Sequence, residues 1–371
     1  MLIAAIVLSA ACGGEKAPQD QGIKVGFYGA LTGPTATFAL SGKNGVLLAV
    51  EEVNRAGGVL GKQITLLAED DRGEAAEAAS VVSKLITRDH VVALIGEQAS
   101  SRTLAAAPIA QSYGVPMITP TSTNVEVTKK GDYIFRVCFI DSYQGQAIAT
   151  FARKNLKAET GALLIDSRND YSVGLAEEIR KDFTALGGRI LSEMKYSEGD
   201  SDFSAQLTAL RPENPDVLFV PGYYTDAGLI ARQARTLGLK ATLLGADGWD
   251  SPKLVEIGGA ATEGSYFANN FSVEDPSPAV GRFVAAYKAR YGAEPDGIAA
   301  HSYEAMRLLA DAIGRAGSTE GKRVRDALAS TRDFAGVTGV ITMPPDRNPV
   351  KPAVILKVDR GRFQFAASIA P

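Results

Sequence analysis

The feature that most constrains the fold is a unit of alternating strand and helix patterns that occurs twice along the chain. The first copy runs QITLLAEDDRG, EAAEAASVVSKLITRD and VVALIGE, which predicts strand, helix and strand. The second copy runs LGGRILSEMKYSEGDSDFSAQLTALRPENPDVLFVPG, with the same elements at nearly the same spacing. Such alternation predicts two doubly wound parallel sheets, each covered by helices on both faces.

Other patterns support an α/β protein with two similar lobes. VVALIG, ALLID and VLFVPG are continuously apolar, as expected for strands buried on both faces. A chain of 371 residues also favours two domains over a single core. We expect residues 23–140 plus 271–345 to form lobe 1, and residues 141–270 plus 346–371 to form lobe 2. A backbone that crosses repeatedly between lobes makes a multi-crossing hinge.

Three helices are predicted outside the repeated unit. Apolar periodicity predicts a helix over residues 43–56, closed by the glycines of AGG, and others over 280–291 and 302–316. The last hundred residues are too few for a third sheet, so we expect them to complete the first two.

Six polar loops each follow an apolar strand, three in each half: GALTGPTATF, GEQASSRT, TPTSTN, DSRNDYS, PGYYTD and GADGWD. In open α/β sheets the ligand lies beyond the carboxyl ends of the strands. If the two lobes face each other, these loops line one cleft, which is the default binding site.

The beginning of the chain predicts export. Residues 2–11 are an apolar and small-residue run that is too short to span a bilayer, and Cys12 follows two alanines. This pattern resembles a lipoprotein processing site, although no basic residue precedes the run and Ser9 stands where leucine is more usual. We expect residues 1–22 to be a signal and tether, with Cys12 lipidated. Cys138, within YIFRVCFID, is expected to be a small core residue.

Composition and motifs argue against several functions. The net charge is −3 and no long basic cluster occurs, so we expect no nucleic-acid partner. GxSxG, HExxH, P-loop, CxxC and strand-linked GxGxxG motifs are absent from the sequence, and the two histidines, His90 and His301, lie outside the polar loops. We therefore expect no catalytic residues, metal or cofactor, and an enzyme is the disfavoured alternative.

The helix that opens with Ser100 and Ser101 allows two interpretations. A serine oxygen there often only caps the helix. Alternatively, the hydroxyl and the free N–H groups of an electropositive helix start hold an anion in the cleft. A carboxylate such as Asp247 on the opposing lobe would suit an ammonium group, so the two together would suit an α-amino acid. Asp247 could equally be a turn residue, and Tyr171 and Tyr223 could be packing residues.

The order of these motifs resembles one family. GALTGPTATF, EDDRG, IGEQASSRT, GVPMITPTSTN, RVCFIDSYQG, DYSVGLAE, PGYYTDAGLIARQARTLGL and GADGWD occur in the register of the periplasmic leucine/isoleucine/valine-binding proteins. These are type I solute receptors of ABC importers, and the resemblance extends from Ile23 to about Phe365.

The resemblance implies a role for each matching position. Ser100 would hold the ligand carboxylate, Thr123 would bridge carboxylate and ammonium, and Ser101 would be a bystander. The Thr121 carbonyl and Asp247, which replaces a glutamate of the family, would accept the ammonium. The remaining implied positions are two tyrosines that close over the ligand, a first-lobe aromatic residue and a hinge residue: Tyr171, Tyr223, Phe38 and Asp141.

Three departures from the family pattern leave the ligand open. Asp247 is shorter than glutamate, Gln98 stands where branched-chain members tend to be apolar, and Trp249 is expected to add bulk beside the ammonium site. The candidate ligands are therefore leucine, isoleucine and valine, together with aromatic or polar amino acids, amides and small carboxylates.

The expected protein is a monomeric extracytoplasmic receptor, anchored through Cys12, that delivers its ligand to an ABC permease. The alternative is a sensor in which the same two lobes close on a ligand and signal to a partner.

Overall fold

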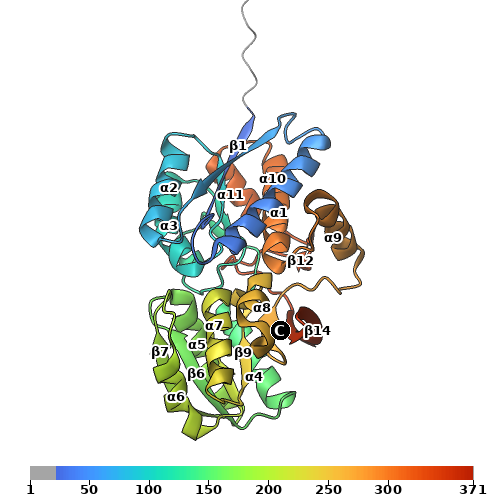
Figure 1. Ribbon diagram of the computed structural model, residues 1–371. Coiled ribbons are helices and arrows are strands. Elements are labelled where there is room, and N and C mark those ends of the chain that lie inside the picture. Colours follow the sequence, from blue (N-terminus) through green and yellow to red (C-terminus); the bar gives the residue numbers. More distant parts are fainter. Residues whose placement is uncertain (1–21, 371) are drawn as a thin grey trace, which may run out of the picture.

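The computed structural model describes residues 22–370, which form two lobes stacked one on the other (Figure 1). The first lobe contains a five-stranded sheet in the order β2-β1-β3-β4-β5, and neighbouring strands in it run parallel. Its strands are β1 (Ile23–Gly29), β2 (Ile64–Asp70), β3 (Ala93–Ile95), β4 (Met117–Thr119) and β5 (Ile134–Arg136).

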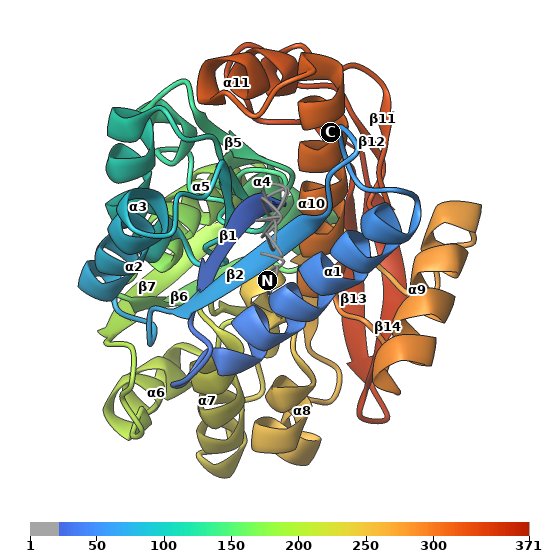
Figure 2. The same cartoon turned by 90° about the horizontal axis from the view of Figure 1, so that it is seen from above.

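Helices cover both faces of this sheet, and α1 and α10 lie side by side on one face (Figure 2). The first-lobe elements outside the sheet are α1 (Ala36–Arg55), α2 (Ala75–Thr87), α3 (Ser100–Tyr113), η1 (Thr128–Lys130), α9 (Pro278–Tyr291), α10 (Gly297–Ala316), α11 (Gly321–Ala329), β11 (Phe334–Ala335) and β12 (Val340–Ile341). Val46 of α1 and Leu309 of α10 share one buried cluster, whereas Val82 of α2 and Ala107 of α3 belong to another. The sheet is thus buried from both sides.

The second lobe contains a seven-stranded sheet in the order β14-β13-β10-β9-β8-β6-β7. Its strands are β6 (Thr160–Asp166), β7 (Arg189–Tyr196), β8 (Val217–Phe219), β9 (Thr242–Gly245), β10 (Tyr266–Asn269), β13 (Ala353–Asp359) and β14 (Arg362–Ile369). Its helices are α4 (Asp141–Lys154), α5 (Asp170–Ala185), α6 (Ser204–Leu210), η2 (Arg211–Glu213), α7 (Tyr224–Thr236), η3 (Asp247–Trp249), α8 (Pro252–Gly258) and η4 (Gly259–Thr262).

The predicted α/β class with two doubly wound lobes is confirmed, but the second sheet is mixed. β13 pairs antiparallel with both β10 and β14. The cause is the two-residue turn between β13 and β14, where Arg360 and Gly361 have φ values of 52° and 71°. Two consecutive positive φ angles are the signature of a type I′ turn, which joins antiparallel strands.

Two helices begin more than a full turn earlier than the sequence predicts. α1 begins at Ala36 instead of residue 43, so Phe38 lies in its first turn. α10 begins at Gly297 because the Asp296 carboxylate accepts a hydrogen bond from the Ala299 N–H at 2.8 Å and caps the helix. His301 consequently lies within α10, buried beside Thr338, and not at the helix opening.

The described chain passes between the lobes in three places: after β5, after β10 and between β12 and β13. Cys138, in the first of these connections, is a buried thiol. In the third, the Lys351 ammonium forms an ion pair with Glu304 of α10, and both side chains are fully buried. This pair fixes the third connection to the first lobe.

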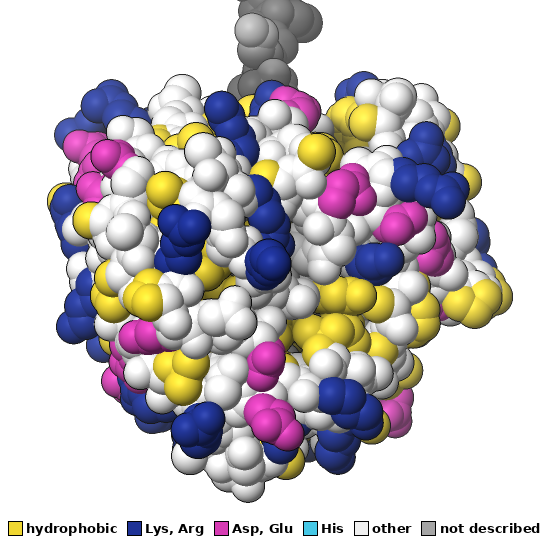
Figure 3. Space-filling view, turned by 60° about the horizontal axis from the view of Figure 1, so that its bottom comes forward, with side chains coloured by type: hydrophobic (Ala, Val, Ile, Leu, Met, Phe, Trp, Pro, Cys, Tyr) yellow, Lys and Arg dark blue, Asp and Glu magenta, His cyan; other side chains and the backbone are white. Residues whose placement is uncertain are grey.

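No helix in the described part of the chain has the length and apolarity needed to cross a membrane. Acidic and basic side chains are interspersed on the face of the molecule seen in Figure 3, with hydrophobic patches between them.

Candidate functional site

A cavity lies between the two lobes where the polar loops meet. Its lining comes from α1, α3, the loops after β3 and β4, and three parts of the second lobe, with one residue of α10: Phe38, Gln98, Ser100, Thr121, Tyr171, Tyr223, Asp247, Gly248 and Ile298. The space left between these side chains is about 10 Å³, room for one water molecule. A second cavity of about 290 Å³ lies within lobe 1 between α9, α10 and β11, and its lining includes none of the predicted site residues.

Ser100 supplies the first-lobe wall at the start of α3. The residue at the N-cap is Ala99, and no side chain caps this helix. The Ser100 hydroxyl instead accepts a hydrogen bond from the Asn124 N–H at 3.2 Å and lines the cavity. The capping interpretation is therefore wrong for Ser100. The first N–H groups of α3 lack partners within the helix, which makes this wall electropositive.

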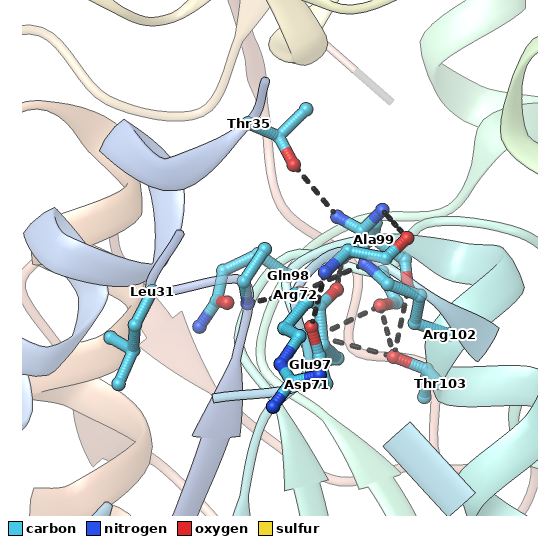
Figure 4. Close-up of polar contacts among 12 residues, drawn as sticks. Leu31, Thr35, Asp71, Arg72, Glu97, Gln98, Ala99, Arg102 and Thr103 are labelled. Atoms are coloured by element: carbon cyan, nitrogen blue, oxygen red, sulfur yellow. Dashed lines mark hydrogen bonds and ion pairs between the residues drawn. The ribbon is translucent and has the colours of Figure 1, made fainter. Parts of the chain in front are cut away.

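A buried polar cluster holds the start of α3 in place (Figure 4). The Glu97 carboxylate forms an ion pair with Arg102 at 3.1 Å and accepts hydrogen bonds from the N–H groups of Ala30 and Ala99. Arg102 also donates to the Thr35 hydroxyl at 3.2 Å. Burial alone would lower the pKa of Arg102, but the adjacent Glu97 raises it overall. The cluster thus orients the loop that carries Gln98 and Ser100.

Sequence reasoning missed this cluster. The available signal was the pair of opposite charges, Glu97 and Arg102, on either side of the predicted helix start in GEQASSRT.

Tyr171 and Asp247 form the second-lobe wall. The Tyr171 hydroxyl donates a hydrogen bond to Asp247 Oδ1 at 2.8 Å and accepts one from the Gly248 N–H at 3.1 Å. Asn169 caps α5 by accepting a hydrogen bond from the Tyr171 N–H at 3.0 Å. The ring of Tyr171 stacks on that of Tyr223, with centroids 5.4 Å apart and an interplanar angle of 1°. These contacts hold the Asp247 carboxylate at the cavity.

The electrostatics of this wall favour a cation. Burial raises the pKa of Asp247 to about 8. The negative charge of Asp141 also raises this pKa, whereas the hydrogen bond from Tyr171 lowers it. Burial also raises the pKa of Asp141 to about 7, opposed by Thr123 and Arg136. No basic side chain lines the cavity, so a bound cation would be the neutralising charge for Asp247.

Aromatic and polar contacts close the cavity on both sides. The ring of Phe38 meets the rings of Tyr223 and Tyr224 edge-on, with centroids 5.6 and 4.9 Å away. The Tyr224 hydroxyl donates to the Pro34 carbonyl at 3.0 Å. Ser101 also contributes, because its hydroxyl accepts a hydrogen bond from the Asp170 N–H at 2.9 Å. Ser101 is therefore an interlobe contact and not a bystander.

Two residues predicted to contact ligand do not line the cavity. Trp249 is 1% exposed and its indole N–H donates to the Val220 carbonyl at 3.1 Å, so its bulk lies in the second-lobe core. Thr123 is fully buried, and its carbonyl accepts a hydrogen bond from the Asp141 N–H at 3.0 Å. Thr121 does line the cavity, with its hydroxyl bonded to the Gln98 carbonyl at 3.0 Å.

Two lining residues were not predicted. Gly248 follows Asp247 directly, and Ile298 lies in the first turn of α10. The signal for Ile298 was Asp296, a helix-capping residue type just before an apolar side chain.

The sequence profile of the family described as periplasmic binding protein matches residues 22–362. The chain belongs to this family. Among the relatives of this periplasmic binding protein is the leucine-, isoleucine-, valine-, threonine- and alanine-binding protein of Pseudomonas aeruginosa, 32% identical over 82% of each chain. The leucine-specific-binding protein of Salmonella typhimurium is also 32% identical, over 85% of each chain.

Solved structures agree with this assignment. The leucine binding protein LivK of Thermotoga maritima superposes with a TM-score of 0.91 and is 40% identical, covering 94% of this chain and 99% of its own. The branched-chain amino acid transporter substrate binding protein LivJ of Streptococcus pneumoniae, solved with isoleucine, has a TM-score of 0.89 and 36% identity, covering 95% and 99%. Within residues 22–370, no group of three or more His, Cys, Asp or Glu residues is arranged to hold a metal ion.

Proposed function

We propose that this periplasmic binding protein is an extracytoplasmic receptor that binds an α-amino acid as its zwitterion between the two lobes. One observation carries the proposal: the start of α3 at Ser100 and the carboxylate of Asp247 lie on opposite walls of one closed cavity. The first offers N–H groups and a hydroxyl to a carboxylate, and the second offers a negative charge to an ammonium. The names of the relatives include leucine, isoleucine and valine as ligands, which supports the same ligand class.

Binding requires the lobes to open and close. The present cavity of about 10 Å³ is far too small to admit an amino acid, and contacts such as Ser101 to Asp170 hold the two lobes together. The ligand enters when these contacts open, places its carboxylate on the lobe that carries Ser100, and is then covered by Tyr171, Tyr223 and Asp247. Because the ligand bridges both lobes, it stabilises the closed form.

The closed, loaded receptor delivers the amino acid to the permease of an ABC importer, and it works as a monomer. The family supports this partner over a signalling protein, which is the second candidate. No chemical step is part of this function. Co-purification with a permease and ligand-stimulated ATP hydrolysis in reconstituted membranes would support transport, whereas their absence together with ligand-dependent kinase activation would support sensing.

Lipid attachment at Cys12 stays a prediction, because residues 1–21 lie outside the described residues. Expression of the full chain with a labelled fatty acid tests it: label that disappears in Cys12→Ser supports the anchor, and an unlabelled chain contradicts it.

A thermal-shift screen across the amino acids, amides and small carboxylates tests the proposed ligand class. An amino acid present at 100 times its dissociation constant should raise the free energy of unfolding by about 2.7 kcal/mol. The proposal fails if no amino acid stabilises the protein while a compound lacking the ammonium or carboxylate does.

A further inference from the structure

The side chain of Gln98 is an unusual wall for an apolar ligand. Gln98 lines the interlobe cavity and is 4% exposed. Neither its amide nitrogen nor its amide oxygen has a hydrogen-bond partner within the described residues. A buried amide without partners is costly, since it has lost water and gained nothing in return.

The fold makes room for this amide with two glycines. A Cβ on Gly29 would lie 2.6 Å from Gln98 Oε1, and a Cβ on Gly42 would lie 2.9 Å from Gln98 Nε2. Either side chain would therefore push the amide out of its position. Gly29 ends β1 and Gly42 lies within α1, so the amide occupies a space that both elements leave open.

A second buried polar group without a partner borders the same space. The hydroxyl of Ser302 would lie 2.9 Å from a Cβ on Gly42, the same distance as Gln98 Nε2. Ser302 is fully buried, and its hydroxyl has no hydrogen-bond partner among residues 22–370. It lies in α10 one turn after Ile298, so both residues lie on the same face of that helix. The polar groups of Gln98 and Ser302 thus both border the space at Gly42, and Gln98 lines the cavity beside Phe38 and Ile298.

We propose that Gln98 forms a subsite for a polar ligand side chain, so that the preferred ligand is an amino acid bearing a hydroxyl or carboxamide group. The inference rests on the proposed function, because it takes the ligand to be an α-amino acid held at Ser100 and Asp247. The Gln98 amide contacts the ligand, and the Ser302 hydroxyl is a second unpaired polar group near the same space.

The physical reason is that only a polar ligand side chain can form hydrogen bonds with the Gln98 amide. A site built to bond a polar group discriminates against an isosteric apolar ligand, because that ligand leaves the amide of the site unpaired. Some relatives are described as binding leucine or isoleucine. A polar ligand is still compatible with the family, because the name of the Pseudomonas aeruginosa relative includes threonine among its ligands.

Isothermal titration of the intact protein with two isosteric pairs, threonine against valine and asparagine against leucine, tests the subsite. We expect the polar member of at least one pair to bind ten times more tightly, or better. Valine and leucine binding as tightly as their polar partners would overturn the subsite while the amino-acid function stands. If none of the four nor any other amino acid binds, the proposed function itself fails.

Two variants assign the effect. Gln98→Met keeps the length of the side chain but removes its hydrogen bonds, so the polar preference should vanish. Gln63→Met is a matched change at an exposed position that should alter nothing. A melting temperature for each variant separates misfolding from lost recognition. A polar preference that persists in a folded Gln98→Met protein would contradict the assignment.

Discussion

Tyr171 and Asp247, which are 76 residues apart in the sequence, are joined by a hydrogen bond of 2.8 Å from the tyrosine hydroxyl to the carboxylate. The bond connects the first turn of α5 to η3, so two loops of the second lobe present one acidic surface to the cavity. The tyrosine ring also covers this surface by stacking on Tyr223. One wall of the cavity therefore combines a carboxyl group held in place with an aromatic cover.

Replacing Asp247 should weaken amino-acid binding more than any other single change in this wall. Asp247→Ala removes the partner of a buried ammonium, which should cost about 2 to 5 kcal/mol of binding free energy. Tyr171→Phe keeps the ring and removes only the hydroxyl, so the cost should be about 1 kcal/mol. Calorimetric titration measures both, and an unchanged dissociation constant for Asp247→Ala with every bound amino acid would refute the ammonium site.

Amino-acid affinity should fall as the pH falls below about 8. Burial raises the pKa of Asp247 to about 8, and an ammonium ligand binds the ionised carboxylate. At lower pH a proton must leave before the ligand can bind, which weakens binding by up to about tenfold per pH unit for one proton. Titrations in buffers of different ionisation enthalpy should reveal proton release at pH 7. That release should be lost in Asp247→Asn, and an equal release there would assign the proton to another group.

The ligand-free protein should show the opposite trend in its own stability. Burial raises the pKa of Asp226 and Asp247 to about 8 and that of Asp141 to about 7. Between an unfolded carboxyl pKa of about 4 and these folded values, the native state binds more protons than the unfolded state. The free energy of unfolding should therefore rise as the pH falls from 8 to 5. A melting temperature that falls steadily over that range would contradict the burial of these carboxyl groups.

The ion pair between Lys351 and Glu304 should be essential for stability but not for recognition. Lys351→Met leaves a buried, uncompensated carboxylate, which should cost about 3 to 5 kcal/mol in urea unfolding. The double variant Lys351→Met with Glu304→Gln should recover part of this loss because no charge is left unpaired. Wild-type stability in Lys351→Met would mean that the pair does not fix the third interlobe connection.

Removing an interlobe contact should shift the lobes apart without touching the cavity. Ser101→Ala deletes the acceptor of the Asp170 N–H, so the ligand-free protein should become more open. Small-angle scattering should show a larger radius of gyration for the free variant and nearly the same value as wild type when amino acid is saturating. Identical free-state curves would show that this contact does not hold the lobes together.

Much of this structure can be predicted from the sequence, because hydrophobic pattern and strand-end position are local signals. These signals predict the alternating units. Strand-end position, together with the family resemblance, also indicated that Ser100, Asp247 and the two tyrosines lie at one cleft, and all four line the cavity. The antiparallel hairpin of the second sheet depends on the backbone angles of Arg360 and Gly361, which a count of strands and helices does not contain.

The side-chain directions could not be predicted in the same way. Trp249 follows Asp247 by two residues, yet its ring turns into the core because its N–H reaches the Val220 carbonyl. The roles of Ser101 and Ile298 depend on where α5 and α10 meet the first lobe, which is a tertiary relationship.

In the proposed receptor, both ends of one zwitterion hold the lobes together. Calorimetric titration with the tightest-binding amino acid, the same molecule without its amino group, and the same molecule without its carboxyl group tests it most directly. We expect tight binding of the complete amino acid and at least a hundredfold weaker binding of both truncated molecules. Equal affinity for either truncated molecule would contradict it.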